Sequence, residues 1–249
     1  MRVFLITGAS SGIGAAVARA VAAPETAIAI HARKNRSGAE RVAQAVGEAG
    51  AQSLIVEGDL SQSGTATRLV EETVARFGHV DAIVSNAGFA DRRLIGEIDR
   101  AAWDASLAAM TSAFFELATA AKPWLLKAGA NGRLVGVSSF VAHAFARGLM
   151  TFPASAAAKA GMEALAKALA ADIASSGATV NCVAPGFVEK DADGHAAVPP
   201  ERMAKISESI PMGRYARTAE IAAVIAFLCS PAASYVTGQT IHVNGGLTL

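Results

Sequence analysis

The sequence has few charged residues and no long hydrophobic run. Charged residues make up 17% of the 249 residues, and the formal net charge is +1. Such a chain lacks the basic surface that nucleic-acid binding needs, so the expected partner is a small-molecule substrate.

The most apolar late segment, 221–229, is far shorter than the roughly 20 residues that span a bilayer. The apolar run at the start is too short for a signal peptide and ends in a glycine turn. We therefore expect a first strand there and no membrane contact.

Cysteine is also scarce. Cys182 and Cys229 are the only two, and they lie in separate apolar segments. Nothing near them has the spacing of metal ligands. We expect buried free thiols in a cytoplasmic protein, and no metal site.

Short strand-like runs alternate with longer alanine-rich runs at helical spacing. This alternation predicts an α/β fold in one domain over residues 1–249, with helices on both faces of a parallel sheet. The expected strands are 3–7, 27–31, 53–57, 82–85, 133–137, 179–183 and 240–243. The expected helices are 13–22, 37–49, 64–77, 101–127, 155–175 and 219–228. The least regular segment, 186–211, follows a strand and is a candidate substrate lid.

A glycine-rich turn follows the first expected strand and leads into an apolar helix. It reads TGASSGIG over residues 7–14. In such a turn Gly8 permits the tight bend, Gly12 lets a pyrophosphate approach the backbone, and Gly14 allows the helix to pack on the sheet. The residues between them complete the candidate cradle: Ser10, Ser11 and Ile13.

The spacing of these glycines resembles that of the short-chain dehydrogenase/reductase family. Further matches are DL at 59–60, SNAG at 85–88, VNCVAPGFV at 180–188 and SYVTGQTIHVNGG at 234–246. The resemblance implies a single-domain doubly wound Rossmann fold with a seven-stranded parallel sheet. It also implies a homo-oligomer, dimer or tetramer, formed through the long helices. The cofactor contacts that it implies are Asp59 and Leu60 at the adenine, Asn86, Ala87 and Gly88 in the dinucleotide cleft, and Pro185, Gly186 and Val188 beside the nicotinamide.

The end of the second strand indicates which nicotinamide cofactor binds. An NAD site needs a carboxylate about 20 residues past the glycines, whereas a 2′-phosphate needs arginine. Here Ala32 stands at the acidic position, and Arg33, Lys34 and Arg36 follow. This pattern favours NADP over NAD, and NAD stays possible.

The reaction site departs from the family pattern. By resemblance, Ser139 is the serine that supports the reacting oxygen, and Lys159 is the lysine of the Tyr-x-x-x-Lys motif. Ser155 stands where that motif has tyrosine, and Met110 stands where the family has asparagine. The only tyrosines, Tyr215 and Tyr235, lie in C-terminal segments that the family does not use for chemistry. After PGFV, Lys190 replaces a threonine that often contacts the carboxamide.

Two residues are candidates for the missing acid. Ser155 can hold an oxyanion or relay a proton from water, although a serine hydroxyl is a much weaker acid than a phenol. His143 is the second candidate, because an imidazole is a common proton donor in catalysis. The Ser-x-x-x-Lys pattern also resembles, in part, the dienoyl-CoA reductases.

Three functions follow from this reading. The first is an NADP(H)-dependent oxidoreductase acting on a carbonyl or conjugated enone. The second is an enoyl or dienoyl thioester reductase. The third is a nucleotide-binding subunit with little or no turnover.

Overall fold

The computed structural model describes residues 1–145, 151–189 and 200–249, except for the side chains of residues 200 and 202. Lys190, which stands where the family often has a threonine, lies outside the described residues, as does the part of the candidate lid at 190–199. Among the described helices, none combines the length and the apolar composition needed to cross a membrane.

The described residues form a seven-stranded parallel sheet with the order β3-β2-β1-β4-β5-β6-β7. This confirms the predicted fold class. The strands are β1 (Arg2–Ile6), β2 (Thr26–Ala32), β3 (Gln52–Glu57), β4 (Ala82–Ser85), β5 (Arg133–Val137), β6 (Thr179–Pro185) and β7 (Thr240–Val243). The helices are α1 (Gly12–Val21), α2 (Arg36–Glu48), α3 (Thr65–Phe77), α4 (Arg100–Leu107), α5 (Ala113–Ala128), α6 (Pro153–Ile173), α7 (Pro200–Glu208) and α8 (Thr218–Cys229).

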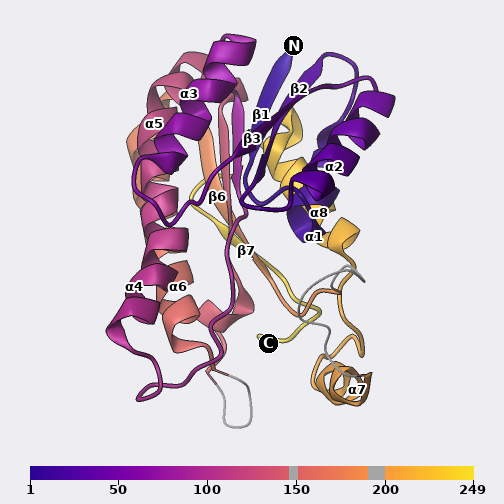
Figure 1. Cartoon of the computed structure of the whole chain (residues 1–249), viewed down its shortest axis with the longest axis vertical. Helices are drawn as coiled ribbons and strands as arrows, with labels where there is room; N and C mark the ends of the chain where they lie inside the picture. The colour runs from indigo at the N-terminus through magenta and orange to yellow at the C-terminus, as the bar shows by residue number, and fades with distance from the viewer. Residues whose placement is uncertain (146–150, 190–199) are drawn as a thin grey trace.

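Helices cover both faces of the sheet (Figure 1). α1, α2 and α8 pack on one face, and α3, α5 and α6 pack on the other. Phe4 and Ile6 of β1 belong to the first core, and Leu5 between them belongs to the second. Successive side chains of a strand point to opposite faces, so a strand covered on both sides must be apolar throughout.

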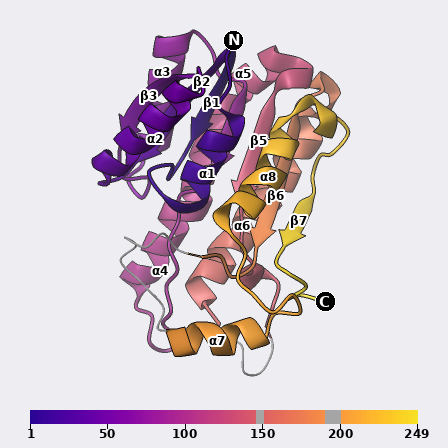
Figure 2. The same cartoon turned by 90° about the vertical axis from the view of Figure 1, so that its right-hand side faces the viewer.

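The strand order reverses between β1 and β4. From β1 the chain winds outward through β2 to β3, then returns to place β4 on the other side of β1. The turns after β1 and β4 therefore diverge at the carboxyl ends of neighbouring strands. Such a crevice is where ligands bind in open α/β sheets. Figure 2 shows α7 lying beyond these carboxyl ends.

Two predictions about helices need correction. The expected helix 101–127 is interrupted at Ala108–Ser112 by a π-helical turn between α4 and α5. Inside this turn Met110 is buried, and Thr111 Oγ1 donates to Ala158 O of α6 at 2.8 Å. A widened turn of this kind often marks a functional site. The segment 186–211, expected to be irregular, also contains α7.

Candidate functional site

The turn after β1 has the backbone geometry of a phosphate cradle. Gly8 (φ +62°) and Gly12 (φ +57°) both adopt the left-handed region that favours glycine. A Cβ added at Gly12 would meet no atom within 4 Å, so the space beside its backbone is open. A Cβ at Gly14 would instead overlap Gly8 O and lie 2.6 Å from Asn86 Nδ2. Gly12 thus leaves room for a ligand, and Gly14 allows close packing.

The same turn is joined to the end of β4. Asn86 Nδ2 donates to Thr7 O at 2.9 Å and to Gly8 O at 3.1 Å. The Thr7 hydroxyl accepts the backbone N–H groups of Asn86 and Ala87, at 2.9 and 3.0 Å. These bonds fix the two turns that flank the crevice. Ser11 precedes α1, and the helix N-terminus contributes N–H groups and a positive dipole end.

His31 is a member of this site that sequence reasoning missed. It is buried near the end of β2; its Nδ1 accepts the Gly8 N–H at 3.0 Å, and its Nε2 lies 3.0 Å from Gly58 O. Burial lowers the pKa of His31. A neutral imidazole that accepts at Nδ1 and donates at Nε2 satisfies both contacts. The only sequence signal was a histidine within an otherwise apolar strand.

Exposed cations lie where the second strand ends. Ala32 is buried, and the exposed Arg33 has its Nη1 4.0 Å from Asp59 Oδ2. The Asp59 carboxylate accepts the backbone N–H and the hydroxyl of Ser61, at 3.0 and 2.7 Å, and these bonds lower its pKa. Arg36 is already paired with Glu40 and with Glu57, whose Oε2 lies 2.7 Å from Arg36 Nη1. Lys34 is exposed and Leu60 is buried beside this region.

Lys159 lies at the opposite end of the crevice. Its Nζ donates to Val137 O of β5 at 2.5 Å, and it is 3.4 Å from the position that a Cβ on Gly88 would take. Met110 Sδ is equally close to that position. Lys159 is only 8% exposed, and burial lowers the pKa of its ammonium to about 8. The structure therefore brings Lys159, Gly88 and the end of β5 together.

Ser155 is buried one helical turn before Lys159. Its Oγ accepts the Asp91 N–H at 3.0 Å and donates to Phe89 O at 3.4 Å. The hydroxyl therefore holds the segment that follows β4. The bond to Phe89 O is long, so rotation of the hydroxyl can redirect its proton while Oγ still accepts from Asp91.

Ser139 caps the short 3₁₀ turn Phe140–Ala142 that follows β5, because its Oγ accepts the Val141 N–H at 3.3 Å.

On the other side of the crevice, β6 ends at Pro185, and a Cβ on Gly186 would lie 2.8 Å from Asn244 Cα. Gly186 thus permits close contact with the chain after β7. Val188 is half-buried and bridges to Ala216.

His143 is exposed and bonds to the buried carboxylate of Glu163. Its Nε2 lies 2.9 Å from Glu163 Oε1, and the Ser138 hydroxyl bonds to the same oxygen. Thr240 Oγ1 donates to the other carboxylate oxygen at 3.3 Å, and the His143 ring packs edge-on against His242 with centroids 4.4 Å apart. Glu163 lies one turn beyond Lys159 on α6. Sequence reasoning did not single out this glutamate, because nothing in the helix pattern distinguishes it from a solvent-exposed residue.

Neither tyrosine lies beside Lys159 among the described contacts. Tyr235 is fully exposed. Tyr215 is buried, and its ring packs against Phe187 at a centroid distance of 5.6 Å.

The fold and the glycine turn define a nucleotide-binding α/β protein of Rossmann type. The family described as "Enoyl-(Acyl carrier protein) reductase" matches residues 8–248. The chain is 35% identical over 246 residues to the 3-oxoacyl-[acyl-carrier-protein] reductase FabG of Escherichia coli, covering 99% of this chain and 97% of that protein. It is 33% identical over 246 residues to the Staphylococcus epidermidis enzyme of the same name, covering 98% and 97%.

Solved structures agree with these relatives. A short-chain dehydrogenase/reductase from Serratia marcescens matches with a TM-score of 0.91 at 28% identity, covering 100% of this chain and 98% of that one. A short chain dehydrogenase from Burkholderia cenocepacia in complex with NADP matches with a TM-score of 0.90 at 26% identity, covering 100% and 98%. The chain belongs to the short-chain dehydrogenase/reductase family, which confirms the resemblance seen in its motifs. The open backbone at Gly12 and the cations near Ala32 fit a nicotinamide dinucleotide.

Proposed function

We propose that this chain is an NADP(H)-dependent oxidoreductase of atypical short-chain type, which transfers hydride to or from a carbonyl or conjugated enone with Ser155 in place of tyrosine. The observation that carries this proposal is the position of Lys159. A buried ammonium bonded to the end of β5 and packed against Gly88 lies in the crevice that the glycine turn also borders. A costly buried cation at the carboxyl ends of the strands is typical of a binding or catalytic group.

NADPH, which the glycine turn and Lys159 would hold, would supply the hydride for addition to the electrophilic carbon. The electron pair of the C=O bond then moves to oxygen, which needs hydrogen-bond donors and finally a proton. We assign Ser139 as a donor to this oxygen and Lys159 as the group that binds the ribose. The proton reaches the oxygen through the Ser155 hydroxyl or from His143. The pKa of Lys159 near 8 keeps it largely charged at neutral pH, which supports the developing negative charge.

The alternative within enzymes is an enoyl or dienoyl thioester reductase. Hydride then adds to the conjugated double bond at the end away from the thioester carbonyl. The thioester oxygen carries the negative charge until the carbon beside the carbonyl takes up a proton. The oxygen needs only to be held during this reaction, for which a serine and a lysine suffice. The family description that matches residues 8–248 supports this alternative. The engagement of Ser155 by backbone groups supports the other alternative, a nucleotide-binding subunit with little turnover.

The Ser155→Ala variant separates a reacting from a purely structural serine. We expect turnover to fall about 10²-fold with little change in NADPH affinity, because the oxygen loses a donor. Loss of the Asp91 contact alone would cost only about 1 kcal/mol of stability and leave turnover intact. Steady-state kinetics with enone and ketone substrates, together with urea unfolding, measure both effects. Ser106→Ala is the matched control, because Ser106 is a buried serine of α4 whose Oγ has no partner among the described residues.

The same experiment includes Ser155→Tyr. Ser155 is only 3% exposed and lies against Phe89 and Asp91, so a phenol ring has to displace that segment. We expect no gain in ketone turnover. A Ser155→Tyr variant that reduced simple ketones faster than the wild type would identify an ordinary carbonyl reductase that had merely lost its acid.

The cofactor preference depends on Arg33. We expect the wild type to bind NADPH at least about tenfold more tightly than NADH, because a charge-assisted bond to the 2′-phosphate is worth about 1.5–3 kcal/mol. Arg33→Ala should bring the two affinities close together in titrations followed by nicotinamide fluorescence. Arg36→Ala should keep the preference, because Arg36 is already paired with Glu57 and Glu40. Equal affinities in the wild type, unchanged by Arg33→Ala, would refute the assignment.

Cytoplasmic location and assembly into a homodimer or homotetramer through the long helices remain predictions from the sequence.

A further inference from the structure

The segment between β4 and α4 is held in place on both sides of Arg92. Before it, the Asp91 N–H donates to Ser155 Oγ at 3.0 Å. After it, Arg93 turns back onto the buried Asp91 carboxylate, with Nη2 and Nε at 2.5 and 3.0 Å and its backbone N–H at 3.0 Å. These bonds lower the pKa of Asp91. The charge of Arg93 is therefore compensated, and the backbone that carries Arg92 is fixed.

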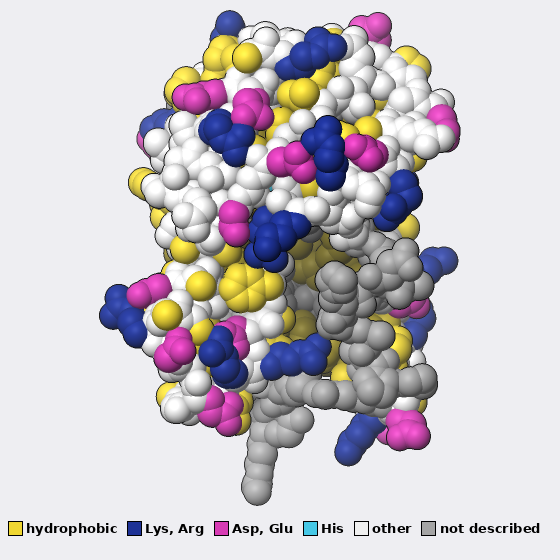
Figure 3. All heavy atoms as spheres, in the orientation of Figure 1, with side chains coloured by type: hydrophobic (Ala, Val, Ile, Leu, Met, Phe, Trp, Pro, Cys, Tyr) yellow, Lys and Arg dark blue, Asp and Glu magenta, His cyan; other side chains and the backbone are white. Residues whose placement is uncertain are grey.

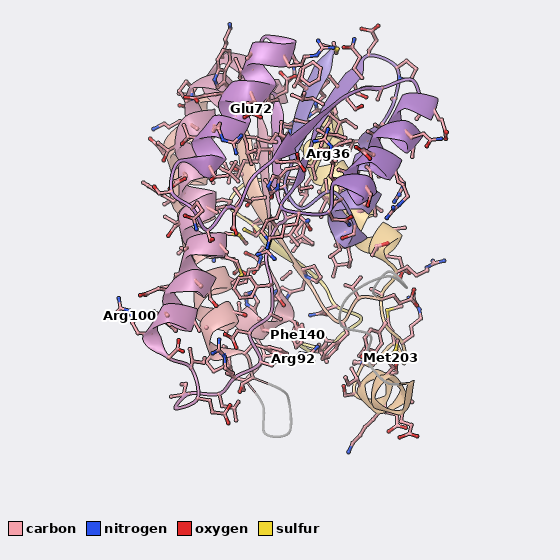
Figure 4. All side chains as sticks on the ribbon, viewed as in Figure 1. Arg36, Glu72, Arg92, Arg100, Phe140 and Met203 are labelled. Carbon is pink, nitrogen blue, oxygen red and sulfur yellow. The ribbon has the colours of Figure 1, made fainter. Side chains whose placement is uncertain are left out.

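Arg92 itself has no such compensation within the described part of the chain. Its side chain is exposed, and no described carboxylate lies within ion-pair distance of it. The Asp91 bond to Ser155 joins this segment to the start of α6, where Phe152 and Ala156 share an apolar cluster with Phe140. The labels of Arg92 and Phe140 lie together in the view of Figure 4. In the same orientation, Figure 3 shows a hollow with hydrophobic side chains in its walls and a basic side chain at its lower rim, where Figure 4 labels Arg92.

Apolar side chains occur in the segments joined to the one that carries Arg92. The Phe140 ring is buried and packs against Phe187 at a centroid distance of 4.7 Å. Phe187 is the second residue after β6, and Phe89, three residues before Arg92, is 45% exposed. Low-polarity walls strengthen the attraction between a guanidinium and an anion, since less water screens the pair. An arginine that pairs with no described carboxylate is suited to bind a carboxylate or phosphate with two parallel hydrogen bonds.

We infer that Arg92 binds an anionic oxygen group of the substrate, and that the substrate is a carbonyl or enone compound with an apolar body and an acidic end. The inference rests on the proposed function. The reacting group would lie at Ser139 and Lys159, the apolar body against Phe140, and the anionic end at Arg92. Because the backbone of Asp91, next to Arg92, is bonded to Ser155, the distance between Arg92 and the reacting group at Lys159 is fixed.

The test measures binding and turnover separately. With the protein loaded with NADP⁺, the affinities of 4-phenylbutanoate, its methyl ester and 3-phenylpropyl phosphate are measured by calorimetry. Of the carboxylate and the phosphate, the one that the wild type binds more tightly should bind about tenfold more tightly than the ester. Arg92→Gln should remove this preference. The ranking of the two anions distinguishes carboxylate from phosphate. Arg100→Gln is the matched control, because Arg100 is an exposed arginine of α4 that is paired with Asp104 at 2.8 Å.

Turnover is then compared for 4-oxo-4-phenylbutanoate and its methyl ester with NADPH. Arg92→Gln should lower kcat/KM for the acid about tenfold and leave that for the ester unchanged. The inference is overturned if the wild type binds neither anion more tightly than the ester, if Arg92→Gln keeps the preference, or if Arg100→Gln loses it equally. Anion binding through Arg92 without turnover of any carbonyl or enone would support the subsite and refute the proposed reductase activity.

Discussion

Replacement of Lys159 by methionine should lower turnover at least about 10²-fold and weaken NADPH binding at least about tenfold. Methionine keeps the length of the side chain but removes the ammonium that we assign to the ribose and to the developing charge on the substrate oxygen. Kinetics and fluorescence titration measure the two effects. Lys127→Met is a control for the loss of one positive charge, because Lys127 is an exposed lysine near the end of α5 that has no role in the proposed site. Wild-type turnover in Lys159→Met would refute the proposed site.

The same variant should change how stability depends on pH. Burial lowers the pKa of Lys159 from 10.5 to about 8. Below pH 8 the lysine is protonated in both the folded and the unfolded chain, and it contributes no pH dependence there. Between pH 8 and 10.5 the unfolded chain retains a proton that the folded chain has lost, so the free energy of unfolding contributed by this residue rises with pH. The rise amounts to about 3 kcal/mol across the window.

Urea unfolding of the cofactor-free protein between pH 7 and pH 10 measures this rise. Lys159→Met should lack it, and Lys127→Met should keep it. Parallel pH curves for the wild type and Lys159→Met would show that the lysine does not titrate in the folded protein as its burial implies.

Gly14→Ala should destabilise the protein by about 3 kcal/mol, because the added methyl group overpacks a site closed by backbone. Its Cβ would overlap Gly8 O and lie 2.6 Å from Asn86 Nδ2, and Asn86 is itself bonded to Thr7 O and Gly8 O. Any repacking therefore breaks the bonds that join the turns after β1 and β4. Cofactor affinity should fall together with stability.

Two other glycines serve as controls for this variant. Gly47→Ala in α2 meets no atom within 4 Å and should stabilise the chain by about 0.5–1 kcal/mol. Gly12→Ala also meets no protein atom, but its positive φ should cost about 1–2 kcal/mol. Unfolding midpoints in urea rank the three variants. A Gly14→Ala protein as stable as the wild type would show that the turn is looser than its geometry indicates.

The sequence identified the strands because each is a short apolar run between turn residues. β4, β5 and β7 begin and end where the pattern placed them, and the other strands differ by one or two residues at an end. It also located the glycine turn, since left-handed backbone is a local requirement that selects glycine whatever lies nearby. The π-helical turn at Ala108–Ser112 was not predictable, because the bond from Thr111 to Ala158 that accompanies it joins residues 47 apart.

By itself, the sequence determined the fold class, the family and the glycine turn after β1, and it predicted that Ser155 stands in place of the motif's tyrosine. Each of these depends on residue type and spacing along the chain. Only the tertiary structure decided that Ser155 bonds to the segment at Phe89 and Asp91, that His31 bonds to Gly8, and that Glu163 bonds to Ser138 and His143. It also decided that Arg93 pairs with Asp91, whereas Arg92 pairs with no carboxylate among the described residues. These facts depend on which side chains meet after folding, and hydrogen bonds and ion pairs between distant residues leave no period or spacing in the sequence.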